Sequence, residues 1–176
     1  SSAASDVYKR QVMQDVSELK KAYAELENMV IYDQLTGVYS MYSFMEHCKQ
    51  YDEYNGSVAV VVCDINHLSD INIQYGQKAG NQALINVAGV LKKILMDRAY
   101  IARINEGDFV AVMKNVTDAE ADKTFEQIKR TVEKECNNGK LGVTIEYGIA
   151  MRKASNRWIM DIVHEAVNDM RDRKGR

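Results

Sequence analysis

The sequence predicts an α/β fold in which helices flank one β-sheet. Two observations carry this prediction. A continuous β-branched apolar run at residues 57–63 is typical of a buried strand, and helical and strand patterns alternate along the rest of the chain. The chain has 176 residues, of which 46% are hydrophobic and 27% charged, so it suits one globular domain with a short appendage.

Composition and charge exclude several classes of protein. The formal net charge is −2 and there is no long block of Lys and Arg, which argues against a nucleic-acid-binding surface. No apolar run approaches the roughly 18 residues that a membrane span needs, and no secretory leader is visible. Cys48, Cys63 and Cys136 form no CxxC pair, so we expect neither a zinc site nor disulfides. We expect a cytoplasmic domain, either free or as the cytoplasmic part of a membrane-bound sensor.

The start of the chain predicts a signalling helix. Residues 1–11 resemble a non-native extension, and we set them aside. Over residues 12–31, apolar positions alternate at spacings of four and three, the repeat that keeps one seam facing a partner helix. The seam comprises Val12, Val16, Leu19, Tyr23, Leu26 and Val30. Two interpretations stay open: a coiled coil that forms a homodimer, or an amphipathic helix that lies on its own domain.

The next part of the chain predicts one helix, one strand and two further helices. A helix over residues 40–51 begins at a serine, a favourable N-cap. The apolar run at 57–63 suits a central strand covered on both faces, which leaves Asp64 at its carboxyl end. Helical patterns follow over 67–76 and 81–95, with apolar residues on one face.

The last part of the chain predicts a hairpin followed by helix, strand and helix. Two short strands, 100–104 and 109–113, flank a Gly-containing connection typical of a hairpin. A helix over 118–135, a strand over 141–150 and a helix over 155–172 complete the chain. Two βα units around one sheet with an inserted hairpin give the ferredoxin-like arrangement, an α/β sandwich for which we expect mixed strand directions.

Four stretches resemble motifs of the GGDEF (diguanylate cyclase-like) family. Residues 33–38 (Asp-Gln-Leu-Thr-Gly-Val) are similar to DxLTGL, and residues 64–81 are similar to DIDxFKxIN…YGHxxGD. Residues 102–109 match ARxGGDEF and residues 144–150 match TxSIGIA. The resemblance covers residues 32–176 and implies the nucleotidyl-cyclase palm, in which two facing protomers each present one GTP. Carboxylates of the family hold Mg²⁺ for this chemistry.

The metal-binding positions of the family are partly kept. Asp64 matches the first metal-binding Asp and the Ile65 carbonyl matches the backbone ligand, so the resemblance implies Mg²⁺ here when nucleotide is bound. The signature reads Asn-Glu-Gly-Asp-Phe, and its catalytic carboxylate position is Gly107. Glu106 or Asp108 is the alternative ligand, although neighbours on a strand point to opposite faces.

The nucleotide-binding positions are also altered. Asn72 matches the guanine-contacting Asn of the family, whereas Asn81 replaces the Asp that accepts two hydrogen bonds from guanine. Because an amide offers one acceptor and one donor, GTP selectivity should be weak. Ser69 and Asp172 stand where the family has phosphate-binding Lys residues, and Arg176 keeps a match. Three other cations either compensate for the missing lysines or complement the helix dipole: Arg171, Arg173 and Lys174.

The resemblance therefore predicts a degenerate GGDEF domain in bacterial cyclic-di-GMP signalling, impaired in catalysis, that serves as a regulatory, dimerisation or nucleotide-sensing module. The alternative is a slow diguanylate cyclase that uses Asp64 with Glu106 or Asp108. Expected partners are a second copy bound through the N-terminal helix, GTP or another guanine nucleotide, and an upstream sensor or downstream phosphodiesterase domain.

Overall fold

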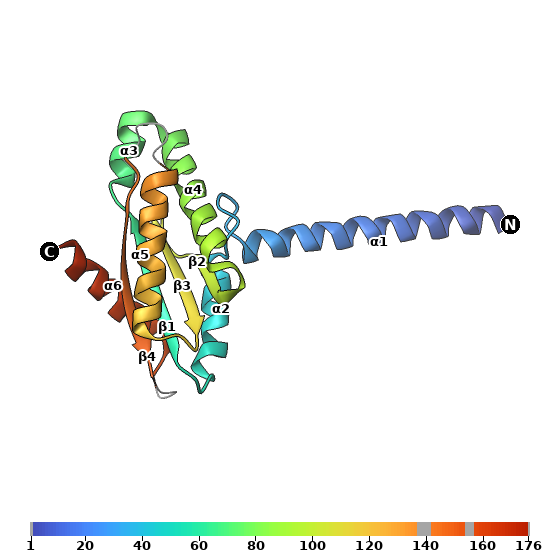
Figure 1. The fold of residues 1–176 in the computed structure, drawn as a ribbon. Helices are drawn as coiled ribbons and strands as arrows, with labels where there is room; N and C mark the ends of the chain where they lie inside the picture. The colour runs from blue at the N-terminus through green and yellow to red at the C-terminus, as the bar shows by residue number, and fades with distance from the viewer. Residues whose placement is uncertain (1, 137–141, 154–156, 176) are drawn as a thin grey trace.

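The chain folds into one sheet with helices on both faces and a long helix at the N-terminal end (Figure 1). This computed structural model describes residues 2–136, 142–153 and 157–175. The helices are α1 (Ser2–Ile31), α2 (Met41–Asp52), α3 (Leu68–Tyr75), α4 (Gln77–Leu95), the 3₁₀ turn η1 (Met96–Arg98), α5 (Asp118–Glu135) and α6 (Ile159–Lys174). The strands are β1 (Val58–Ile65), β2 (Ala99–Arg103), β3 (Asp108–Lys114) and β4 (Ile145–Arg152).

The strand order β2-β3-β1-β4 confirms the ferredoxin-like α/β fold. Helices α3 and α4 connect β1 to β2, and α5 connects β3 to β4. Each connection joins two parallel strands, but a strand of the other unit lies between them, so β1 pairs antiparallel with β3 and β4, and β2 with β3. The expected mixture of strand directions was therefore wrong for this sheet. Among the described residues, parallel pairing is confined to the isolated bridge between Tyr39 and Ala102.

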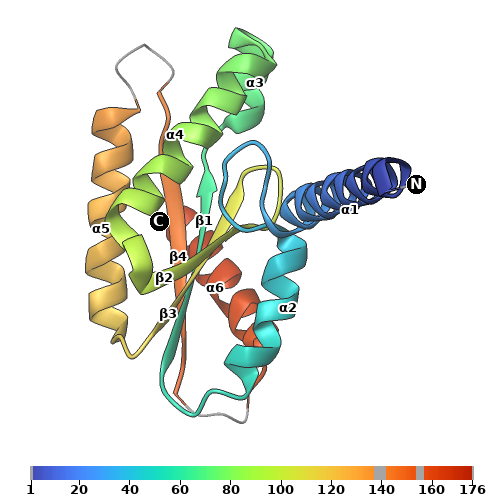
Figure 2. The ribbon, with the colours of Figure 1, turned by 90° about the vertical axis from the view of Figure 1, so that its right-hand side faces the viewer.

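The central strand β1 is buried on both faces, as its apolar sequence predicts. Side chains such as Ala59 and Val61 join the core beneath α4 and α5, whereas Val60 and Val62 join a second core beneath α2 and α6. Figure 2 shows the helices lying on the two sides of the twisted sheet. The sheet thus holds the end of β1, where Asp64 stands, between two helical layers.

Local side-chain hydrogen bonds explain two of the helix starts. The Ser40 hydroxyl accepts a hydrogen bond from the Ser43 N–H at 3.1 Å, which confirms Ser40 as the N-cap of α2. Thr117 and Glu120 form a capping box at the start of α5.

The last strand and the last helix begin later than the sequence predicts. β4 begins at Ile145, and the predicted start at residue 141 lies outside the described residues. α6 begins at Ile159, and its predicted start at residue 155 also lies outside them. The Ile159 N–H donates to the Asp52 carboxylate of α2 at 2.6 Å. Because Asp52 and Ile159 are 107 positions apart in the sequence, no local capping pattern could predict this contact.

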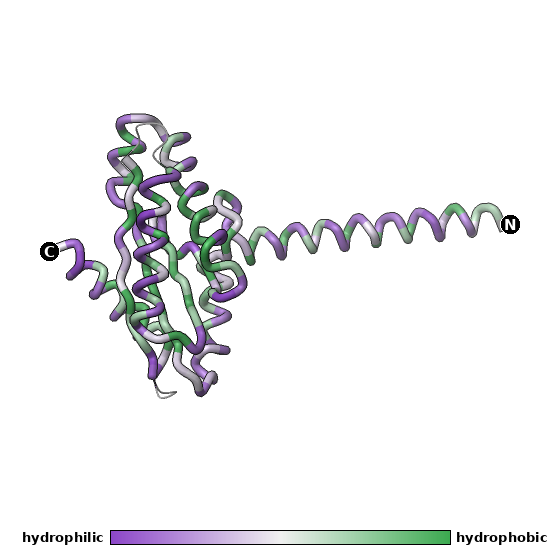
Figure 3. Tube along the Cα trace, in the orientation of Figure 1, coloured by the Kyte–Doolittle hydropathy of each residue, from purple (hydrophilic) through white to green (hydrophobic). Residues whose placement is uncertain are grey.

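Helix α1 projects away from the domain (Figures 1 and 2). It begins at Ser2, without a break at the division that we expected near residue 12, and every side chain from residue 3 to 30 is exposed. Hydrophobic and hydrophilic segments alternate along it in Figure 3. The structure therefore does not lay this helix on its own domain. Among the described helices none, α1 included, has the apolar length to cross a membrane.

Candidate functional site

The residues singled out by the sequence gather in a pocket of about 510 Å³ at the carboxyl end of β1. Strand β1, helices α3 and α4, and the connection between β2 and β3 each contribute to its wall. The predicted site residues in its lining are Asp64, Ile65, Ser69, Asn72, Asn81, Glu106 and Gly107. Arg176, the remaining predicted nucleotide-binding residue, lies outside the described residues.

Gly107 faces Asp64 across the pocket. A β-carbon at Gly107 would lie 3.1 Å from Oδ1 of Asp64 and 3.3 Å from Cδ2 of Leu68. The backbone here is ordinary, because Gly107 has no positive φ, and its carbonyl accepts the Ile65 N–H at 3.2 Å. A side chain at this position would therefore start beside the Asp64 carboxylate, and the glycine supplies no carboxylate there.

Neither neighbouring carboxylate takes over this place in the structure. Asp108 is the direct cross-strand partner of Asp64, but it does not line the pocket. Burial raises the pKa of Asp108; a hydrogen bond from the Asn105 amide opposes the rise, and the nearby charge of Asp64 adds to it. Glu106 lines the pocket with its side chain exposed. Both lie close to Asp64 without completing a metal site.

Lys174 is one of the three cations that the sequence places at the end of the last helix. Its Nζ lies 2.5 Å from Oδ2 of Asp64; the exposed fraction is 35% for the Lys174 side chain and 27% for the Asp64 side chain. We had left open whether the cations at the end of the last helix compensate for missing lysines or only complement its dipole. The structure gives Lys174 a specific partner in the pocket wall.

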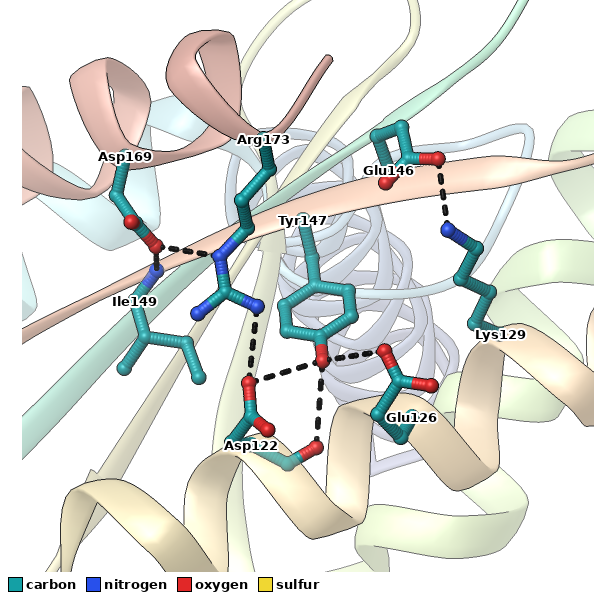
Figure 4. A network of polar contacts seen from close by, with 8 residues as sticks. All are labelled: Asp122, Glu126, Lys129, Glu146, Tyr147, Ile149, Asp169 and Arg173. Carbon is teal, nitrogen blue, oxygen red and sulfur yellow. Dashed lines mark hydrogen bonds and ion pairs between the residues drawn. The ribbon is translucent and has the colours of Figure 1, made fainter. Parts of the chain in front are cut away.

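A polar network fixes the last turn of α6 beside Lys174 (Figure 4). Arg173 donates to Asp169 at 2.8 Å and to Asp122 of α5 at 2.9 Å, and its guanidinium lies over the Tyr147 ring. The Tyr147 hydroxyl donates to Asp122 and to Glu126. Burial raises the pKa of Tyr147, and these hydrogen-bonded carboxylates raise it further. The network joins α5, β4 and α6 around the sheet edge.

Arg103 contacts both the turn after α1 and the loop of residues 104–107 between β2 and β3. Its guanidinium lies 3.3 Å from the Asp33 carboxylate and donates to the carbonyls of Asn105 and Glu106 at 3.2 and 2.7 Å. Burial alone would raise the pKa of Asp33, but hydrogen bonds from Thr36 and the charge of Arg103 outweigh burial and lower it. The sequence placed Asp33 and Arg103 in separate motifs and did not predict their pairing.

The two asparagines of the nucleotide site stand in different surroundings. Oδ1 of Asn72 is buried without a hydrogen-bond partner and packs against Gly80, where a β-carbon would lie 1.9 Å away. Oδ1 of Asn81 accepts a hydrogen bond from Gln77 at 3.1 Å. Asn72 therefore keeps an unpaired oxygen buried against Gly80, whereas the acceptor of Asn81 is already engaged.

The residues present do not fit the magnesium site that the resemblance implies. Mg²⁺ needs several oxygen ligands in near-octahedral geometry. Here Asp64 is paired with Lys174, Gly107 supplies no carboxylate, and the side chain of Asn66 donates to Thr144. The described part of the chain contains no group of three or more His, Cys, Asp or Glu residues placed to hold a metal ion.

The antiparallel sheet, the pocket at the end of β1 and the altered signature together define a nucleotidyl-cyclase-type domain. A family model described as "Diguanylate cyclase, GGDEF domain" matches residues 30–176. The chain therefore belongs to the GGDEF family, the domain type of cyclic-di-GMP signalling.

Individual relatives share this region at moderate identity. YhcK of Bacillus subtilis (strain 168) is 32% identical over 128 residues, which cover 68% of this chain and 36% of that protein. The probable diguanylate cyclase DgcF of Escherichia coli O157:H7 is 27% identical over 134 residues, 74% of this chain and 28% of DgcF. The chain thus spans about a third of the length of these relatives.

The likeness to a solved structure extends to the N-terminal helix. The coiled coil and GGDEF domain of DgcB from Caulobacter crescentus, solved in complex with c-di-GMP, has a TM-score of 0.85 and 20% identity. The likeness covers 97% of this chain and 95% of that one, which shows that the fold is shared along almost the whole length.

Proposed function

We propose that this GGDEF domain is impaired as a cyclase and acts as a regulatory or dimerisation module in cyclic-di-GMP signalling. The main support for the proposal is Gly107, which has no side chain. A β-carbon added at this position would lie 3.1 Å from Oδ1 of Asp64. Diguanylate cyclase chemistry needs carboxylate-held metal ions to activate the attacking hydroxyl and to stabilise charge on the phosphate. With one of these carboxylates absent, little cyclisation is expected.

The surroundings of Asp64 support the same conclusion. Its carboxylate is paired with Lys174, so a divalent ion would have to displace an ammonium group. Burial raises the pKa of Asp108, which disfavours the charged form that a metal ligand needs. These two facts count against the alternative of a slow cyclase that uses Asp64 with Asp108 or Glu106.

Nucleotide sensing without turnover is a second candidate, favoured by the pocket itself. Its volume of about 510 Å³ is in the range of small-molecule sites, and Asn72 is among the residues that line it. The amide of Asn81 in place of a carboxylate leaves one guanine donor without an acceptor. That mismatch costs roughly 1–3 kcal/mol, or about one to two decades of affinity.

The homodimer, the ligand and the remainder of the protein belong to this proposal. The exposed apolar seam of α1 supports dimerisation through that helix. In such a protein the domain would lie in the cytoplasm, between an upstream sensor and a downstream phosphodiesterase or another effector. Guanine nucleotide, with Mg²⁺ on its phosphates, is the ligand to test first.

Turnover of GTP tests the proposal directly. The purified chain and a covalently cross-linked dimer are incubated with GTP and Mg²⁺ or Mn²⁺, beside an active diguanylate cyclase, and cyclic di-GMP is quantified by mass spectrometry. We expect no product above the enzyme-free blank. Robust formation of cyclic di-GMP that disappears in Asp64→Asn would contradict the proposal and support the slow cyclase. Calorimetry with GTP, GDP and cyclic di-GMP then tests nucleotide sensing, with no binding below millimolar concentrations counting against it.

A further inference from the structure

We propose that the ε-ammonium group of Lys174 is a resident cation that takes the place of a divalent metal ion at Asp64. The inference deepens the proposed function and rests on it, since it explains how a cyclase site without its metal ligands remains a stable structure.

The first argument is the charge that Lys174 balances. Asp64 and Asp108 are direct cross-strand partners at the end of two neighbouring strands, so two carboxyl groups stand side by side. Like charges directly opposite one another destabilise a sheet, and a cation beside Asp64 offsets the charge of the ionised member of the pair. Nζ of Lys174 lies 2.5 Å from Oδ2 of Asp64, a short charge-assisted contact. The ammonium group therefore supplies the positive charge that a metal ion would otherwise provide.

The second argument is that the backbone of α6 carries Lys174 to this position. α6 lies so close to β4 that a β-carbon at Gly148 would be 2.1 Å from the Ala166 carbonyl oxygen and 2.2 Å from the Met170 nitrogen. One residue before Lys174, Arg173 is held by ion pairs to two carboxylates. The last turn of α6 is thus fixed, and it places the backbone of Lys174 within reach of Asp64.

The third argument concerns what an ammonium group does differently from a metal ion. It carries one positive charge and donates hydrogen bonds, but it has no open coordination positions. It can neutralise Asp64, with which it is paired. It cannot lower the pKa of a bound hydroxyl in the way that a metal ion does. Lys174 thus neutralises Asp64 as a metal ion would, but it cannot support the metal-dependent cyclase reaction.

The test removes the ammonium group and offers a metal ion in its place, with nucleotide left out. Lys174→Met is compared with Lys153→Met, which removes the same charge from an exposed position. Thermal unfolding is followed with and without millimolar MnCl₂, against NaCl at matched ionic strength, and Mn²⁺ binding is measured by calorimetry. Asp64→Asn/Lys174→Met tests whether any Mn²⁺ response depends on Asp64.

We expect Lys174→Met to lower the unfolding midpoint by about 2–4 °C relative to Lys153→Met, and Mn²⁺ to restore most of that loss. Wild type and the double variant should show no Mn²⁺ response, and Lys174→Met should bind Mn²⁺ at least tenfold more tightly than wild type. Mn²⁺ binding by wild type as tight as by Lys174→Met would overturn the inference, as would equal midpoints for the two single variants. If Lys174→Met does not fold, Lys174→Gln takes its place in both measurements. Because no nucleotide is present, these results are independent of the GTP assay.

Discussion

The absence of a side chain at Gly107 removes one of the carboxylates that cyclase chemistry needs. A β-carbon at this position would lie 3.1 Å from Oδ1 of Asp64, so a side chain there would start beside that carboxylate, but glycine supplies no second carboxylate. Restoring that group, however, leaves three other changes in place: the ammonium of Lys174 on Asp64, the amide of Asn81 in the base site, and Ser69 in place of a phosphate-binding lysine.

We therefore expect Gly107→Glu alone to give no efficient cyclase. The added carboxylate meets Asp64 at short range, and this like-charge contact should lower the free energy of unfolding by about 1 kcal/mol. Product formation is measured by mass spectrometry and stability by urea unfolding. Gly107→Ala is the control that adds the β-carbon without the charge. Strong recovery of cyclic di-GMP synthesis would show that the base and phosphate losses matter less than we infer.

At the scale of elements, the contact between α6 and β4 positions the C-terminal side of the site. Gly148 allows the helix backbone to approach the strand, and the network of Arg173, Asp122 and Asp169 anchors the last turn (Figure 4). The Ile149 N–H, on the outer edge of the sheet, donates to the same Asp169 carboxylate at 2.8 Å. This arrangement covers an edge strand and delivers Lys174 to Asp64.

Gly148→Ala should consequently destabilise the domain by about 1–3 kcal/mol, because the methyl group meets helix backbone rather than a movable side-chain end. The matched control is Gly89→Ala in α4, where a β-carbon meets nothing within 4 Å. Since alanine favours helix more than glycine does, this control should stabilise the domain by about 0.4–1 kcal/mol. Urea unfolding measures both variants. Equal stabilities for the two would refute the close approach of α6 to β4.

At the scale of the whole molecule, α1 is a 30-residue helix with little to hold it in isolation. Exposed helices are marginally stable in water, and an exposed apolar seam favours association with a second helix. The exposed fractions along this seam run from 41% at Val12 to 63% at Tyr23. Asp33, in the turn after α1, forms an ion pair with Arg103, and Arg103 donates a hydrogen bond to the Glu106 carbonyl in the loop between β2 and β3. A change in the packing of α1 can therefore reach the site through these contacts.

Charges placed in the seam should therefore dissociate a dimer. We expect Leu19→Lys/Leu26→Lys to shift the chain from dimer to monomer in sedimentation velocity, because two lysines cannot be desolvated in a helix interface. Gln14→Lys/Ser17→Lys adds the same charge outside the seam and should leave the dimer intact. Equal association of the two double variants would indicate that α1 pairs through another face.

Much of the fold was predictable because it is local in origin. The apolar run of β1, the N-cap at Ser40 and the helical periodicities each report burial or backbone geometry over a few residues. Three residues that the motifs singled out, Asp64, Asn72 and Asn81, line one pocket, and their roles there stay predictions. Their spacing reflects strand and helix lengths, which fix where each side chain falls along its element.

The sequence by itself determined the α/β class, the family resemblance, the apolar seam of residues 12–31 and the loss of the signature carboxylate, because all of these lie in residue identity and short-range pattern. The tertiary structure alone decided the antiparallel directions, the cap that Asp52 gives α6, and the pairing of Lys174 with Asp64. That pair spans 110 positions, so it exists only because α6 packs across the sheet onto the end of β1. Such a contact depends on how whole elements pack, which no local pattern encodes.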